Sequence, residues 1–171
     1  MRRLLIGGGL GALVVSVLAV SLAACGGSGG DSASERELQR QADLYAIDQI
    51  EKTWHRATSE QDVDLMMSLW APNATFNVGP GETLTGKEEI RRFWVDAPVF
   101  QAENRWVSET PAYKIRITLN GDRGTLYFEC HYVDPKTGKV IRVVGADQQV
   151  ARIDGRWLIT NYIGASPSLT P

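Results

Sequence analysis

Clusters of basic residues are missing from this sequence. The 171 residues include 18 lysines and arginines against 20 aspartates and glutamates, a formal net charge of −2 at pH 7. No run of basic residues is interleaved with aromatic ones. Proteins that bind nucleic acid need a positively charged surface to meet the phosphate backbone. The sequence therefore excludes nucleic acid as an expected partner.

Long apolar runs are almost as rare, and the one present spans residues 4–24. Two arginines precede it and small residues close it, which is the pattern of a secretory signal segment. It ends in Leu-Ala-Ala-Cys at residues 22–25, which resembles the lipobox of bacterial lipoproteins, where the cysteine is diacylated on sulphur and becomes the new N-terminus. We therefore expect residues 1–25 to be a lipoprotein signal peptide that ends at Cys25.

A transmembrane helix is the alternative for residues 4–24. Four glycines weaken it as a helix, at positions 7, 8, 9 and 11. Lipidation is favoured because stable anchoring needs two acyl chains or more, which this route supplies. We expect acylated Cys25 to hold the protein on the cell membrane, facing the extracytoplasmic side. The arginine pair leaves open whether export follows the twin-arginine route.

Cysteine and histidine are scarce, with two of each in the chain. Once Cys25 is acylated, Cys130 has no partner in the chain, which excludes an internal disulfide. His55 lies near the edge of an apolar helical stripe, where a histidine is most often a surface or boundary residue. His131 falls in a row of charged residues, and we interpret it as structural. No metal and no cofactor are expected.

The rest of the chain has the composition of one globular domain, 43% hydrophobic and 22% charged. Residues 26–36 are rich in glycine and serine, which predicts a flexible tether. We place the folded domain at residues 37–165 and a short C-terminal tail at residues 166–171.

Two amphipathic helices begin the domain. Apolar residues recur every three or four positions between residues 37 and 59, which predicts a long helix with one buried stripe. Glu51 is placed mostly off this stripe. Asp62 is a typical N-cap residue and predicts a second helix over residues 63–70. The stripe of the long helix consists of Leu44, Ile47, Ile50, Trp54 and Ala57.

A strand, a turn, a second strand and a helix are predicted between residues 75 and 94. The turn falls at Gly79-Pro80-Gly81, because proline fixes φ and glycine permits positive φ. Thr85 and Glu88 have the spacing of a capping box, in which the glutamate reaches back to the threonine amide. This unit joins the helix pair to the strands that follow.

Four long strands complete the chain. The alternation of apolar and polar residues along them predicts their register. For the apolar residues of the first two to share a face, Ile117 must oppose Leu126 and Ile115 must oppose Phe128.

The last two turns determine the register of the strand between residues 139 and 153. Pairing across the turns at 134–139 and 154–155 sends the odd-numbered residues of this strand to the apolar face. Asp147 then lies on that face, although a bulge at Gly145 would turn it outward. Its expected neighbours are Phe128, Cys130, Tyr132 and Tyr162.

The same register assigns the opposite face of the sheet. At one end it predicts a cross-strand charge ladder that consists of Lys114, Arg116, Glu129 and Arg142. At the other end it predicts an exposed apolar patch, and such patches mark interfaces. We expect a homodimer through this patch, which comprises Tyr127, Val144, Val150, Trp157 and Ile159.

The sequence resembles the NTF2-like superfamily and, within it, the SnoaL-like domains. The resemblance is carried by residues 69–76, 85–94 and 154–159, and it covers roughly residues 40–165. It implies an α+β fold, a cone in which a strongly bent mixed sheet wraps around a long N-terminal helix. A pocket is implied at the wide end of the cone.

The chemistries of this superfamily do not transfer to this chain. Ketosteroid isomerase needs a tyrosine, a general-base aspartate and a second acid, and the matching positions here hold Trp54, Val78 and Gln149. The histidine–aspartate arrangement of scytalone dehydratase is not evident, since His55 and His131 both read as peripheral. Fold analogy therefore supplies no reaction.

Two hypotheses on function remain, and we favour the first. It is a membrane-tethered module that binds a small, mostly apolar molecule, or a side chain of a partner protein. The second is an isomerase, dehydratase or cyclase type of enzyme, with Asp147 as general base and Tyr132 or Tyr162 as oxyanion donor. A packed domain without a usable cavity is the third possibility. The expected pocket consists of Trp54, Phe76, Trp94, Tyr113, Phe128, Tyr132, Asp147, Gln149 and Tyr162.

Overall fold

The computed structural model describes residues 28–101, 107–108 and 113–164. The predicted signal peptide with Cys25 and the C-terminal tail lie outside these residues. In chain order the elements are α1 (Ser28–Glu60), α2 (Val63–Met67), β1 (Trp70–Gly79), β2 (Glu82–Thr85), α3 (Lys87–Asp96), the 3-10 helix η1 (Pro98–Phe100), β3 (Val107–Ser108), β4 (Tyr113–Asn120), β5 (Arg123–Val133), β6 (Val140–Ile153) and β7 (Arg156–Tyr162).

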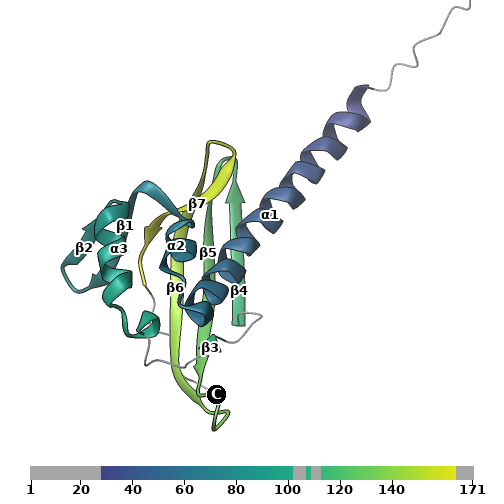
Figure 1. The fold of residues 1–171 in the computed structure, drawn as a ribbon. Coiled ribbons are helices and arrows are strands. Elements are labelled where there is room, and N and C mark those ends of the chain that lie inside the picture. Colours follow the sequence, from purple (N-terminus) through teal and green to yellow (C-terminus); the bar gives the residue numbers. More distant parts are fainter. Residues whose placement is uncertain (1–27, 102–106, 109–112, 165–171) are drawn as a thin grey trace, which may run out of the picture.

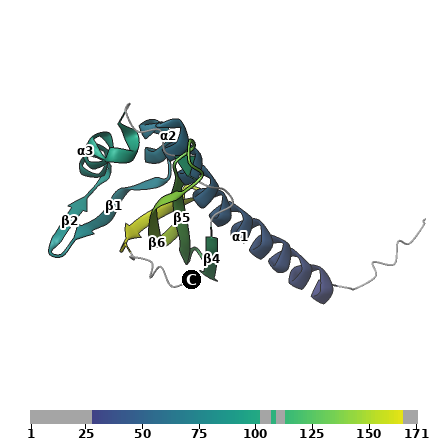
Figure 2. The same ribbon diagram turned by 90° about the horizontal axis from the view of Figure 1, so that it is seen from below.

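The strands of the described residues form one mixed sheet in the order β2-β1-β7-β6-β5-β3, with β4 also paired to β5. β1 runs parallel to β7, and the other pairs are antiparallel. The C-terminal part of α1 lies against the sheet, while β1, β2 and α3 form the far side of the molecule (Figures 1 and 2). This is the α+β cone that the sequence predicts.

Helix α1 begins at Ser28, well before the predicted start at residue 37. Residues 32–42 are exposed, and the first part of the helix projects away from the sheet (Figure 1). The predicted flexible tether is therefore wrong from Ser28 onward, because strong helix formers at residues 33–41 outweigh the glycines before them. None of the described helices is long and apolar enough to cross a membrane.

The C-terminal part of α1 buries the predicted stripe. Ile47, Ile50, Trp54 and Ala57 are at most 3% exposed, and Leu44 is half-buried. Their spacing places them on one side of the helix, where the sheet covers them. The prediction that Trp54 belongs to the core is confirmed.

Helix α2 is shorter than predicted. The Asp62 side chain accepts a hydrogen bond from the Leu65 amide at 2.8 Å, which confirms the N-cap. The helix ends at Met67, because Trp70 already belongs to β1 and is fully buried there.

The capping of α3 differs by one residue from the prediction. Gly86, with φ of 82°, occupies the N-cap position and makes no side-chain bond. The helix therefore starts at Lys87, and the carboxylate that reaches back to the Thr85 amide is that of Glu89 at 2.7 Å, not that of Glu88.

The turns of the last strands form largely as predicted. Both residues of the turn at 154–155 have positive φ, 50° and 75°, as a primed two-residue turn requires. The Asp134 amide donates to the Lys139 carbonyl at 3.0 Å. Ile117 pairs with Leu126 as expected.

The pairing of β4 with β5 is nevertheless irregular near its start. The register moves by one residue between Tyr113 and Arg116, and Lys114 there has φ of 52°. Lys114 and Ile115 of β4 therefore lie opposite the single residue Phe128 of β5, so the predicted pairing of Ile115 with Phe128 falls within the irregular part and stays a prediction.

Strand β6 contains a bulge that the sequence does not signal. Val140 pairs with Val133 and Arg142 pairs with Tyr132, so Ile141 is an extra residue in the ladder. Beyond this point the predicted register of β6 against β5 is wrong by one residue, and every side chain exchanges faces.

Strand β7 contains a second bulge. Val150 pairs with Ile159 but Gln149 pairs with Asn161, so Thr160 is the extra residue. The Thr160 hydroxyl donates to the Gln149 carbonyl at 3.2 Å. The predicted pairings of β7 beyond Thr160 are therefore also wrong by one residue.

The prediction of an apolar patch on the outer face, through which a homodimer was expected, is wrong because most of the patch residues face inward. Val150 and Ile159 are at most 1% exposed and Trp157 is 7% exposed. Val144 is half-buried opposite Cys130. The expected homodimer thus loses the surface on which it was based.

The charge ladder on the outer face is confirmed in part. Lys114 Nζ lies 3.1 Å from Glu129 Oε1, and the Nε2 atom of half-buried His131 lies 3.6 Å from Glu129 Oε2. Arg142, by contrast, leaves this ladder because the bulge at Ile141 turns it to the inner face.

Candidate functional site

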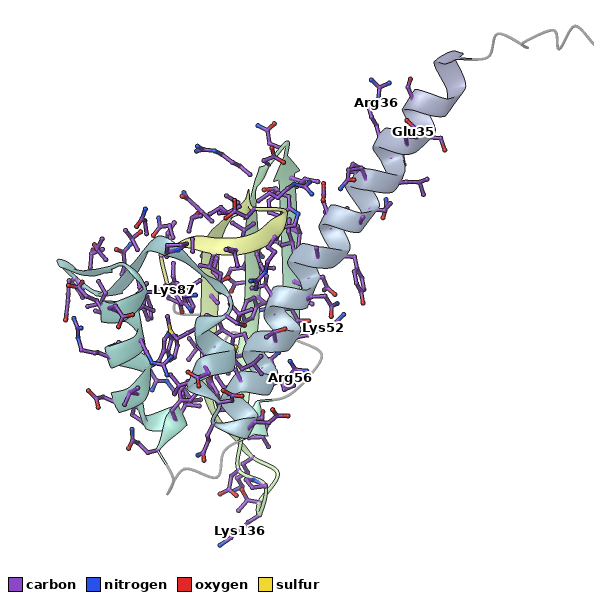
Figure 3. The ribbon with its side chains drawn as sticks, turned by 45° about the horizontal axis from the view of Figure 1, so that its top comes forward. Glu35, Arg36, Lys52, Arg56, Lys87 and Lys136 are labelled. Atoms are coloured by element: carbon purple, nitrogen blue, oxygen red, sulfur yellow. The ribbon has the colours of Figure 1, made fainter. Side chains whose placement is uncertain are left out.

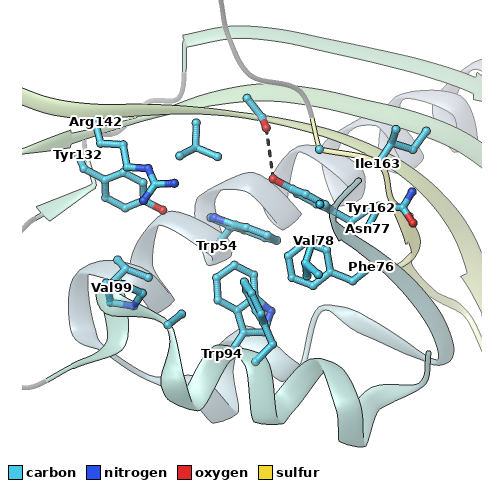
Figure 4. A pocket seen from close by; sticks show the side chains of 17 residues that line it. Trp54, Phe76, Asn77, Val78, Trp94, Val99, Tyr132, Arg142, Tyr162 and Ile163 are labelled. Atoms are coloured by element: carbon cyan, nitrogen blue, oxygen red, sulfur yellow. Dashed lines mark hydrogen bonds between the residues drawn. The ribbon is translucent and has the colours of Figure 1, made fainter. Parts of the chain in front are cut away.

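A cavity of about 490 Å³ opens at the wide end of the cone, between the sheet, α3 and η1 (Figure 4). Its volume lies within the range of pockets that hold small organic molecules. The lining consists of Trp54, Phe76, Asn77, Val78, Gly79, Phe93, Trp94, Ala97, Pro98, Val99, Tyr132, Arg142, Val144, Gly145, Tyr162, Ile163 and Gly164.

Five of the predicted pocket residues line this cavity, namely Trp54, Phe76, Trp94, Tyr132 and Tyr162. They come from α1, β1, α3, β5 and β7, so the fold brings together residues that lie far apart in the sequence. All five are buried.

The other predicted pocket residues lie elsewhere. Asp147 pairs with Tyr127 and is half-buried on the outer face, and Gln149 is exposed. Both were expected inside, and the bulge at Ile141 turns them out. Phe128 is fully buried behind Trp54, with the ring centroids 5.8 Å apart. The side chain of Tyr113 lies outside the described residues.

The walls of the cavity are aromatic rings packed against one another. Trp54 stacks on Tyr162 at 5.8 Å between centroids and meets Trp94 edge-on at 5.1 Å. Phe76 stacks on Trp94 at 5.5 Å and meets Tyr162 edge-on at 4.6 Å. Such contacts fix ring orientation. The cavity is therefore preformed, and it offers flat apolar surfaces.

Polar groups are concentrated at one end of the cavity. Figure 4 shows Arg142 beside Tyr132, near the indole nitrogen of Trp54. The Tyr162 hydroxyl donates to the Gly145 carbonyl at 3.3 Å. Burial raises the pKa of Tyr132 well above its usual value, and it raises that of Tyr162 too. Both hydroxyls therefore keep their protons at neutral pH.

General bases are absent from the cavity wall as far as the described residues go. Its lining includes no aspartate, glutamate or histidine. A proton abstraction of the kind predicted for Asp147 therefore has no carboxylate within the cavity to perform it.

The sequence pattern of the SnoaL-like domain family matches residues 52–158, more than half of the chain. The chain belongs to this family. The SnoaL-like domain thus includes the part of α1 that carries Trp54 and most of the sheet. Among curated proteins, none matches the chain.

Solved structures resemble this SnoaL-like domain in fold. An NTF2-like protein with a cystatin-like fold from Novosphingobium aromaticivorans has a TM-score of 0.68 at 15% identity, covering 81% of this chain and 91% of its own. A protein of unknown function from Nostoc punctiforme has a TM-score of 0.61 at 19% identity, with 76% and 95% covered. A putative dehydratase of the NTF2-like family from Streptomyces avermitilis has a TM-score of 0.58 at 14% identity, with 72% and 94% covered.

Beneath the cavity wall, the SnoaL-like domain buries a polar group that the sequence prediction missed. His55 Nε2 lies 3.0 Å from Cys130 Sγ, and His55 Nδ1 lies 3.0 Å from Glu51 Oε2. All three residues are at most 1% exposed. The prediction that His55 is a boundary residue and that Glu51 lies off the buried stripe is therefore wrong. The four-residue spacing of Glu51 and His55 was the available signal, since it places both on one helix face.

The chemistry available to the Glu51–His55–Cys130 group depends on whether a ligand in the cavity can reach it. None of its three residues lines the cavity, so a ligand there does not touch the thiol or the imidazole. Within the described residues, no group of three His, Cys, Asp or Glu side chains is arranged to hold a metal ion. The Glu51–His55–Cys130 group therefore contributes to the packing of α1 on β5.

Proposed function

We propose that this protein is a membrane-tethered, extracytoplasmic SnoaL-like domain that binds a small, mostly apolar, ring-containing molecule. The observation that carries the proposal is the cavity of about 490 Å³ walled by interlocked aromatic side chains. Flat rings of a ligand gain both apolar burial and ring–ring contact against such walls. The tether rests on the motif at residues 22–25.

Catalysis is left out of this proposal. The alternative enzyme needed the Asp147 carboxylate in the cavity, and the register of β6 puts that side chain on the outer face. The identity of fold with dehydratase-like structures supplies no reaction on its own.

The test is to fill the cavity and to measure binding of a neutral ring compound, 2-naphthamide, by calorimetry. Val99 lies half-buried on η1 and lines the cavity, so Val99→Trp places an indole in the space that the ligand needs. We expect saturable binding to the unsubstituted protein and its loss in Val99→Trp.

Val95→Trp is the matched control, because Val95 is 48% exposed on α3 and does not line the cavity. Binding in this variant is expected to equal that of the unsubstituted protein. Absence of saturable binding, or binding that Val99→Trp leaves unchanged, would contradict the proposal. The cavity would then suit a side chain of a partner protein better than a free molecule.

A further inference from the structure

The described lining of the cavity has a positive charge and no negative one. Arg142 is its one charged side chain, among apolar, aromatic and amide groups. The ion pairs of the described residues do not include Arg142. Because Arg142 is exposed to solvent while it borders apolar walls, water partly screens its attraction for an anion.

The backbone register places Arg142 on the inner face of the sheet, beside the cavity. Because Ile141 is a bulge, Arg142 pairs with Tyr132 and shares its inward face. Figure 4 shows the two side chains together at the polar end of the cavity. The Arg142 side chain is exposed to solvent, and the register of the sheet places it on the face that borders the cavity.

The tryptophan N–H groups of the wall are not open to a ligand. The Nε1 atoms of Trp54 and Trp94 have almost no accessible surface, and the Trp54 indole already interacts with the Tyr132 side chain. Arg142 is therefore the group of the described lining that can recognise an anion.

We propose that the cavity selects ring-bearing carboxylates, with the rings between Trp54, Trp94 and Phe76 and the carboxylate against Arg142. The planar guanidinium group matches a carboxylate with two parallel hydrogen bonds. The Trp54 indole nitrogen faces the same end of the cavity, where it interacts with the Tyr132 side chain. This inference rests on the proposed function and specifies its ligand class.

The experiment compares two probes of nearly the same size and shape, the anion 2-naphthoate and the neutral amide 2-naphthamide, which has an NH2 donor in place of one carboxylate oxygen. Both are titrated by calorimetry into the full-length chain in neutral detergent, with a protein-free micelle blank. We expect the unsubstituted protein to bind the carboxylate about tenfold more tightly than the amide, a typical gain for one partly exposed charged hydrogen-bond pair. Added salt is expected to reduce this preference.

Variants assign the preference to Arg142. Arg142→Gln is expected to weaken naphthoate binding to the level of naphthamide, whereas Arg142→Lys retains part of the preference. Arg56→Gln is the control with the same change of charge, because Arg56 is exposed on α1 (Figure 3). Circular dichroism of each variant checks that the fold is kept.

The outcomes separate the two proposals. Equal binding of both probes, or equal weakening of both by Arg142→Gln, would overturn the carboxylate inference and leave the proposed ring-binding function in place. Failure of both probes to bind would count against the proposed function itself, and the inference would fall with it.

Discussion

Glu51 shows at the residue scale why a buried polar group needs its partner. Its carboxylate is fully buried and lies 3.0 Å from the imidazole of His55. Removing one partner of a buried pair leaves an uncompensated polar group, whereas replacing both with apolar residues is often close to neutral. The pair is therefore expected to behave as a unit.

We predict that His55→Leu lowers the free energy of unfolding by about 3 kcal/mol. The double variant Glu51→Met/His55→Leu is expected to lower it by less than the sum of the losses in the two single variants. Urea unfolding followed by tryptophan fluorescence measures each value. Arg56→Ala, an exposed neighbour, should stay within about 0.5 kcal/mol of the unsubstituted protein. Strictly additive losses would show that the two side chains are not coupled.

Sequence patterns identified apolar residues better than polar ones. Ile47, Ile50 and Trp54 repeat with helical spacing, and a single apolar stripe has one physical meaning. Glu51 and His55 are compatible with a surface, and nothing in a helical pattern says that the sheet covers them too. Their burial depends on Cys130, which lies 75 positions beyond His55 in the chain.

At the scale of elements, one carboxylate ties α1 to two strands. Asp43 on α1 accepts from Arg152 Nη2 of β6 at 2.5 Å and from Trp157 Nε1 of β7 at 3.2 Å. Burial opposes ionisation of Asp43, but these bonds and one from Gln39 outweigh it and lower its pKa. A pKa that is lower in the folded state stabilises the fold at pH values above the usual aspartate pKa of about 3.9.

Asp43→Asn is therefore expected to destabilise the protein by about 1.5–3 kcal/mol at pH 7, the size of one hydrogen bond to a charged group. The difference from the unsubstituted protein should shrink as the pH falls below about 4 and through the lower folded-state pKa, because the native carboxyl is then protonated as well. Urea unfolding at a series of pH values measures it.

Asp48→Asn serves as the control on the same helix, because its partner Lys52 is largely exposed and the pair is screened by water. A deficit of Asp43→Asn that stays constant from pH 7 to pH 3 would argue against an ionised Asp43 in this contact.

The elements themselves could be predicted, but their register could not. Turn chemistry located the hairpin at residues 154–155, since aspartate and glycine there tolerate positive φ. Ile141 and Thr160 are β-branched and look like regular strand residues. A bulge is a property of the pairing between two strands, which the local pattern of one strand does not record. One inserted residue was enough to exchange Asp147 for Arg142 as the charged group facing the interior.

The whole molecule combines this domain with an expected lipid anchor. We predict that Cys25→Ala moves the protein from the membrane fraction to the soluble fraction, because the acyl chains that supply the binding energy are lost. Immunoblots of fractionated cells measure this. Ser28→Ala, which leaves the motif at residues 22–25 intact, should remain membrane-bound. A Cys25→Ala variant that stays in the membrane at the unsubstituted level would show that residues 4–24 anchor the chain themselves.

With such an anchor, the projecting part of α1 would be a rigid spacer between the lipid and the domain. A helix rises 1.5 Å per residue, so the exposed stretch at residues 32–42 is a stiff rod about 16 Å long. A coil of glycine and serine would let the domain tumble and touch the lipid headgroups in every orientation. A rod that continues into the core of the cone transmits its own direction to the domain. Trp54, which lines the cavity, lies near the C-terminal end of α1. If Cys25 is acylated as predicted, we expect the cavity to be held away from the bilayer.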